Sequence, residues 1–114
     1  MYKSAGNLDK AEEYLRKALS LEPQSPQRLN SLATFLIINE RKVEEALGII
    51  DKALILSPDN ANYLHTKGMG LYTLGKYNEA LELLEKSRDL KKPYYSHEVT
   101  THIGEVKKAI EGQK

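Results

Sequence analysis

SPDNANYLHTKGMGLYTLGKYNEALELLEKSRDLKKP, residues Ser57 to Pro93, is the unit from which the chain is built, because its spacing of small and apolar residues recurs upstream. Leu64, Gly68 and Leu71 follow one another at intervals of four and three residues, so they share one face of a first helix. After a turn at Gly75, a second apolar stripe comprises Tyr77, Ala80, Leu81, Leu84, Ser87 and Leu90. The stretch therefore predicts a hairpin of two helices, closed by a proline that cannot continue the helical hydrogen bonds.

The pattern of the second helix occurs three times in the chain. Leu8, Ala11, Leu15, Ala18 and Leu21 correspond to Val43, Ala46, Ile50, Ala53 and Leu56, and these correspond to Tyr77, Ala80, Leu84, Ser87 and Leu90. The first shift is 35 residues and the second is 34, and the additional residue falls at Glu40 or next to it, in a polar turn. Repetition at this period is typical of folds in which each hairpin stacks on the next.

The remaining turn and cap signals predict about six helices. Gly6 and Asn7 form a turn after a helix that ends over Met1 to Ala5, and the following helices cover Leu8 to Leu21, Pro26 to Ile38 and Val43 to Leu56. Ser25 is placed to cap the helix Pro26 to Ile38, and Ser57 or the pair Asp59 and Asn60 to cap the helix that follows Val43 to Leu56. A last segment, Ser96 to Ile110, is apolar on one stripe only, as expected of a helix that covers the end of a stack: Val99, Ile103, Val106 and Ile110.

Length and composition limit the kinds of protein this chain can be. Its 114 residues, 40% of them hydrophobic, suffice for one folded domain. The net charge of +1 comes from 17 basic and 16 acidic side chains that are interspersed, so neither nucleic acid nor an acidic membrane surface is an expected partner. The absence of cysteine excludes disulfides and thiolate metal sites, and leaves the compartment open between cytoplasm and bacterial periplasm. No apolar run approaches the roughly 20 residues that a membrane span requires.

These features resemble the tetratricopeptide repeat, in particular its bacterial members. The resemblance rests on the glycine turns, the closing prolines, and an apolar or aromatic residue followed three positions later by alanine, as in Leu8 and Ala11, Val43 and Ala46, Tyr77 and Ala80. It implies an all-α, right-handed superhelix of antiparallel helix pairs in a single domain over residues 1–114. Its parts are a partial repeat at 1–25, full repeats at 26–59 and 60–93, and a capping helix at 94–114. The sequence departs from the family pattern at Lys67, Ser87, Arg88 and Glu40-Arg41.

The resemblance also implies a concave groove, lined by the first helix of each pair, that receives a peptide or a helix of another protein. The residues predicted to line it are Asn30, Ser31, Thr34, Ile38, Asn62, His65, Thr66, Met69, Thr73 and His102. Such a groove is neutral and polar with a few apolar contacts. For any one of these residues a solvated helix face is an equally good interpretation, but as a set they are the best candidate site.

Family members that bind chaperones clamp C-terminal carboxylates with lysine, asparagine and arginine side chains. The matching positions here hold Asn30, Thr34, Thr66, Glu98 and His102. None of these side chains is a lysine or an arginine, and Glu98 would repel a carboxylate. The sequence therefore predicts no measurable affinity for an acidic, chaperone-type C-terminal peptide.

Two motifs suggest chemistry and fail on their spacing or context. HEVTTH, from His97 to His102, resembles the zinc-protease signature H-E-x-x-H, but its histidines are five residues apart, so on a helix they point roughly 140° from one another. The Gly-Met-Gly sequence at 68–70 lies within a helical pattern and follows no strand, which argues against a phosphate-binding loop. His65 has no partner at a meaningful spacing in the sequence. No catalytic residue, cofactor or metal ligand is therefore predicted.

The leading interpretation is a non-catalytic scaffold that binds another protein or a peptide through the groove. The alternative is a structural repeat segment of a longer protein, or a module that pairs with a second copy of itself. The helix Leu8 to Leu21 favours that alternative, because its wide apolar arc lacks a full partner helix; Leu8, Tyr14 and Leu15 mark the predicted self-association edge. A metal-dependent hydrolase is a third hypothesis, supported only by HEVTTH.

Overall fold

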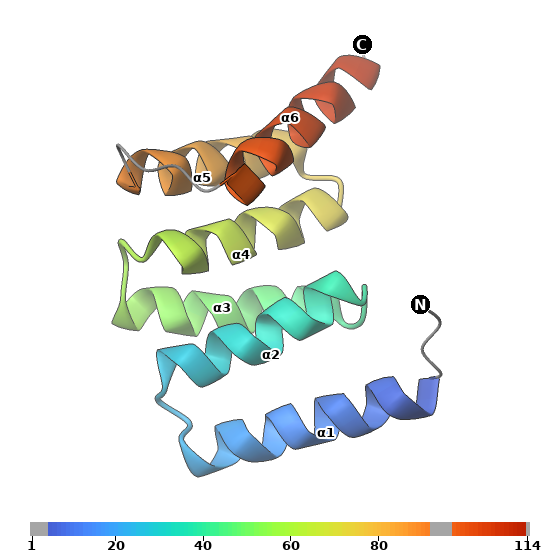
Figure 1. The fold of residues 1–114 in the computed structure, drawn as a ribbon, viewed down its shortest axis with the longest axis vertical. Coiled ribbons are helices and arrows are strands. Elements are labelled where there is room, and N and C mark those ends of the chain that lie inside the picture. The colour runs from blue at the N-terminus through green and yellow to red at the C-terminus, as the bar shows by residue number, and fades with distance from the viewer. Residues whose placement is uncertain (1–4, 92–96, 114) are drawn as a thin grey trace.

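The structure, a computed structural model, describes residues 5–91 and 97–113. Within these residues the chain forms six helices and no strand (Figure 1). The helices are α1 (Ala5–Leu21), α2 (Pro26–Ile38), α3 (Val43–Leu56), α4 (Ala61–Thr73), α5 (Tyr77–Leu90) and α6 (His97–Gly112). They are stacked along a molecule whose principal extents are 40 × 31 × 23 Å. The all-α fold and the expected number of helices are confirmed.

The predicted turn at Gly6 and Asn7 is wrong, because α1 begins at Ala5 and runs through both residues. The first turn of a helix tolerates such residues, since its N–H groups have no intrahelical acceptor in any case. The corresponding glycine in the third repeat, Gly75, does form a turn and adopts a φ of 82°. The helical turn predicted for Met1 to Ala5 lies, apart from Ala5, outside the described residues.

Side-chain caps explain where α2 and α4 begin. The Ser25 side chain accepts a hydrogen bond from the N–H of Arg28, and Pro26 occupies the start of α2. Of the caps predicted for α4, Asn60 is the one used, because its side chain accepts hydrogen bonds from the N–H groups of Asn62 and Tyr63.

The turn between α2 and α3 contains the additional residue that separates the two repeat lengths. It runs from Asn39 to Lys42, whereas the turn between α4 and α5 runs from Leu74 to Lys76. Glu40 and Lys42 have φ values of 51° and 48°, in the left-handed region that non-glycine residues seldom adopt. The longer turn thus absorbs the insertion without disturbing the phase of α3.

Contacts between helices show that the stack curves. Each helix packs on its neighbour in the chain, and α2 also contacts α4, as α4 contacts α6. In contrast, α3 and α5 make no contact over the described residues. Helices α2, α4 and α6 therefore form the inner face of the array, which is turned toward the viewer in Figure 1.

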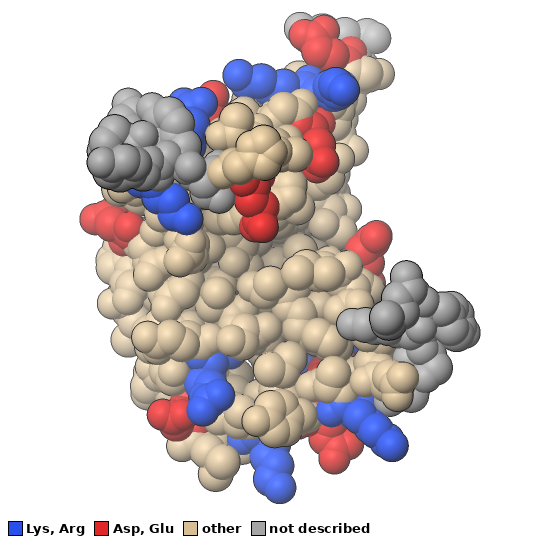
Figure 2. All heavy atoms as spheres, viewed as in Figure 1, with Lys and Arg blue, Asp and Glu red and all other residues tan. Residues whose placement is uncertain are grey.

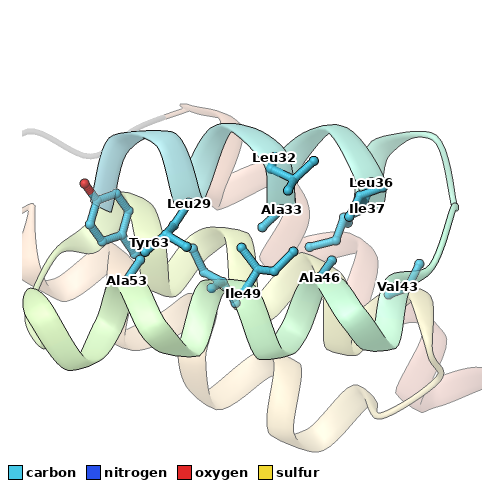
Figure 3. Close-up of a cluster of buried hydrophobic side chains, with 11 residues drawn as sticks. Leu29, Leu32, Ala33, Leu36, Ile37, Val43, Ala46, Ile49, Ala53 and Tyr63 are labelled. Atoms are coloured by element: carbon cyan, nitrogen blue, oxygen red, sulfur yellow. The ribbon is translucent and has the colours of Figure 1, made fainter. Parts of the chain in front are cut away.

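The core consists of two clusters of apolar side chains between the helices. Figure 3 shows the first, in which residues of α2 point toward α3 and Tyr63 of α4 closes one end. Ala33, Leu36, Ala46 and Ile50 are completely buried there. The second cluster joins α4, α5 and α6 around Leu71, Ala80, Leu84, Val99, Ile103 and Val106. Most of these positions belong to the apolar stripes read from the sequence, so the predicted core faces are confirmed.

Two glycines of α4 allow close packing that a Cβ would obstruct. A Cβ on Gly68 would lie 2.8 Å from the Leu84 side chain and 3.4 Å from the backbone oxygen of Ala80. A Cβ on Gly70, for which the sequence suggests no role, would lie 2.8 Å from Leu47 and 3.0 Å from Ile37. The glycines therefore let α4 approach α5 on one side and the α2–α3 pair on the other.

Departures from the family pattern are accommodated by specific interactions. Ser87, completely buried, donates a hydrogen bond of 2.7 Å from Oγ to the backbone oxygen of Ala61. Lys67 extends its ammonium group to within 2.9 Å of Asp51 Oδ1, so this charge on α4 is paired with α3.

No helix in the described ranges combines the length and apolar character needed to cross a membrane.

Candidate functional site

A hollow of about 450 Å³ lies on the inner face, between α2, α4 and α6. We call it the groove. Its lining comprises Thr34, Ile37 and Ile38 of α2, Glu40 of the following turn, His65, Thr66, Met69, Tyr72 and Thr73 of α4, and Glu98 and His102 of α6. Exposed apolar surface comes mainly from Ile38, Met69 and Tyr72, because Ile37 is buried in the first core cluster, and the rest of the lining is polar. The groove therefore offers an apolar patch bordered by hydrogen-bonding groups.

Seven of the ten residues predicted for the groove lie in its lining: Thr34, Ile38, His65, Thr66, Met69, Thr73 and His102. The other three do not. Asn30 accepts a 2.7 Å hydrogen bond from Thr66 Oγ1, and Asn62 accepts one of 2.9 Å from Lys91 Nζ. Ser31 is exposed outside the lining. A binding role for any of the ten predicted groove residues stays a prediction.

Ile37, Glu40 and Tyr72 also line the groove, and so does Glu98, whose position the sequence already matched to the groove of chaperone-binding family members. Glu40 stands in a turn, where no helical periodicity could assign it a face. Tyr72 packs its ring on Tyr77 of α5, with centroids 5.5 Å apart, so it serves both the core and the groove. Glu98 lies four residues before His102, which places both on one face of a helix.

Two histidines meet at the α6 end of the groove, although the sequence suggested no partner for either. His65 Nε2 lies 2.7 Å from His102 Nδ1, which requires one ring nitrogen to donate and the other to accept. Glu98 Oε1 is 3.7 Å from the other nitrogen of His65. Burial and the neighbouring His102 lower the pKa of His65, although Glu98 acts in the opposite direction, so the neutral ring is favoured.

The groove lining contains no lysine or arginine, and its two ionised side chains are both glutamates, Glu40 and Glu98. Figure 2 shows that the middle of this face is uncharged and that lysine and arginine side chains lie toward the ends of the molecule. The electrostatic character of the groove therefore disfavours a carboxylate and suits a neutral or cationic group.

The predicted self-association edge is only partly exposed. Leu15 is half-buried and packs against the first core cluster, and Leu8 is half-buried as well. Tyr14, by contrast, is 70% exposed. The apolar surface that α1 presents to solvent is therefore smaller than the sequence suggested.

An ion-pair cluster attaches α1 to the next hairpin. Glu12 is 6% exposed and accepts hydrogen bonds from Arg16 at 2.8 Å and Lys42 at 3.0 Å. Arg41 Nε lies 3.2 Å from the same carboxylate, and Arg16 also holds Glu45 of α3 with two hydrogen bonds of 2.8 and 2.9 Å. These contacts link α1 to α3, although among the described helices α1 packs only on α2.

Antiparallel helical hairpins stacked into one curved array, with a groove along alternate helices, define a helical repeat protein. Residues 4–87 match the model of a family described as "Anaphase-promoting complex, cyclosome, subunit 3". Over 99 residues the chain is 34% identical to a TPR repeat-containing protein of Pseudomonas aeruginosa. The chain belongs to the tetratricopeptide repeat family. The alignment covers 87% of this chain and only 16% of the Pseudomonas protein.

Solved structures with the same fold include TPR domains of other proteins. The TPR domain of Sgt2 from Aspergillus fumigatus superposes with a TM-score of 0.80 at 22% identity, over 93% of this chain and 70% of that one. The first TPR of Spaghetti (RPAP3), bound to the HSP90 peptide SRMEEVD, superposes with a TM-score of 0.79 at 20% identity, over 93% and 82% of the two chains. Domains of this family are generally protein-protein interaction modules and typically non-catalytic.

Proposed function

We propose that this protein is a non-catalytic scaffold that binds a peptide or a helix of another protein in the groove between α2, α4 and α6. The observation that supports this most directly is the composition of the lining. Ile37, Ile38, Met69 and Tyr72 form an apolar patch, and Thr34, Thr66, Thr73 and the two histidines supply hydrogen-bonding groups around it. Such a combination suits a segment that places an apolar side chain on the patch and its polar groups at the border.

The charges of the groove narrow the chemistry of the partner. Glu40 and Glu98 stand at the border with no cation among the lining residues. A bound segment with a lysine, an arginine or a free amino group near either glutamate gains a complementary charge, whereas an acidic segment meets repulsion. We therefore propose a neutral or basic partner segment with one apolar anchor.

The test begins with selection of peptides from a random display library on the immobilised protein, followed by calorimetry with a selected peptide. Ile38→Ser removes a groove side chain that is 72% exposed, so the fold should tolerate it. We expect binding to weaken by about 1–2 kcal/mol, roughly tenfold, as for loss of an apolar interface anchor. The matched control is Ile55→Ser, since Ile55 is 77% exposed on α3 and lies outside the lining. Equal affinities of the two variants would contradict the proposal.

Self-association through α1 is a second candidate, supported by the 70% exposure of Tyr14 and the 76% exposure of Leu21. Light scattering at high protein concentration measures the solution mass, and a dimer that dissociates in Tyr14→Ser supports this role. A monomer at all concentrations, with groove binding intact, would leave only the peptide-binding proposal.

A further inference from the structure

We propose that His65, Glu98 and His102 form a binding site for a divalent transition-metal ion of the zinc class. One ligand atom from each of the three side chains can be chosen so that all three atoms lie within 4.8 Å of one another. Two imidazoles and one carboxylate are a ligand set that zinc accepts in proteins. The site lies in the groove, where all three residues belong to the lining.

The backbone places these ligands on two packed helices. Glu98 and His102 are four residues apart on α6, so they share a face, and His65 reaches them from α4, which contacts α6. HEVTTH fails as a zinc motif because its two histidines are five residues apart. The metal site instead uses the glutamate and the second histidine of that motif, together with a histidine 37 residues away in sequence.

Small movements bring the ligands to metal-binding distances. His65 Nε2 and His102 Nδ1 are 2.7 Å apart, whereas two nitrogens on one tetrahedral zinc, each about 2.0–2.1 Å from the metal, are about 3.3 Å apart. The rings must therefore separate by a fraction of an ångström. The Glu98 side chain is 70% exposed, which leaves it room to turn toward the pair.

Charged groups of both signs surround this position. The ionisable groups that act on His65 are His102 and Glu98 of α6 and Lys91, which follows α5 and is hydrogen-bonded to Asn62. The groove lining supplies no lysine or arginine of its own. Three protein ligands leave a fourth position, open to the groove, for water or a side chain of a bound partner.

The test is calorimetric titration of the whole chain with Zn²⁺, repeated with Co²⁺, whose visible absorption reports its coordination. We expect one ion per wild-type chain. Glu98→Gln and His102→Ala are each expected to bind at least about 10- to 100-fold more weakly, since even outer partners of metal ligands have effects of that size. The matched controls are Glu105→Gln and His97→Ala, which alter exposed side chains of α6 outside the cluster and should bind as the wild type does.

Absence of wild-type binding would overturn the proposal, as would equal weakening by His97→Ala and His102→Ala. Circular dichroism checks that each variant is folded. If His102→Ala unfolds, Glu98→Gln still tests the metal site, because the glutamate is exposed and its replacement should not disturb the fold. Unchanged Zn²⁺ binding by Glu98→Gln and His102→Ala would place the ion elsewhere and refute the site. The metal alone is the probe, so this result is independent of the proposed peptide binding, which Ile38→Ser tests separately.

Discussion

Replacement of Gly68 by alanine tests the close packing of α4 on α5. The new Cβ would lie 2.8 Å from Leu84 Cδ2, 2.9 Å from Leu84 Cγ and 3.4 Å from the backbone oxygen of Ala80. Leu84 is completely buried, so its Cγ can move only through a change of rotamer within the core or a shift of α5 itself. The substitution therefore overpacks the interface between the two helices.

The expected magnitude follows from two opposing effects. Overpacking a well-packed core destabilises by typically about 1–3 kcal/mol, whereas alanine favours a helix interior by about 1 kcal/mol over glycine. We therefore expect Gly68→Ala to lower the free energy of unfolding by about 1 kcal/mol. Gly48→Ala is the matched control, because it also lies within a helix but its Cβ would meet nothing within 4 Å. That control should raise the free energy of unfolding by about 0.5–1 kcal/mol.

Urea unfolding followed by far-ultraviolet circular dichroism gives both values from the shift of the midpoint. The informative quantity is the difference between the two variants, since the helix-propensity contribution cancels. A Gly68→Ala protein as stable as Gly48→Ala would show that α4 and α5 do not pack as closely as described.

The remaining predictions concern the ion-pair cluster, a buried hydroxyl and the charge of the groove. Hydrogen bonds from Arg16 and then Lys42 lower the pKa of Glu12 from its ordinary value of 4.5. The ionised carboxylate therefore stabilises the fold above pH 4.5, and this contribution is lost as the pH falls through the lowered pKa. Urea midpoints of Glu12→Gln and the wild type should therefore differ at neutral pH and converge in acid; a constant difference would contradict this. Ser87→Ala removes the hydrogen bond to Ala61 and should lower the free energy of unfolding by about 1 kcal/mol in the same assay. The acidic peptide SRMEEVD should give no heat of binding in calorimetry, because the groove lining has two glutamates and no lysine or arginine; tight, salt-sensitive binding would refute the groove assignment.

Helical periodicity in the sequence predicts much of the groove lining, but it does not predict the side-chain contacts that the lining residues make. The face of α4 that carries His65, Thr66, Met69 and Thr73 was predictable, because residues three and four apart share a face. Asn62, predicted for the same face, is instead bonded to Lys91 beyond the end of α5. The side-chain partner of a surface residue depends on which helix end lies nearby, and spacing within one helix contains no such information.

The helices, the phase of the repeats and most residues that face the core could be predicted from the amino-acid sequence alone. These properties are local, because helix caps, prolines and apolar stripes act over a few residues. Among the described residues, the turn predicted at Gly6 and Asn7 was wrong. Which residues of different helices meet depends on the packing of the helices. His65 and His102 come within 2.7 Å only because α4 packs against α6, and Gly70 has a role only because Leu47 and Ile37 close on it. Such contacts depend on the approach and crossing of whole helices, which the sum of all packing interactions sets.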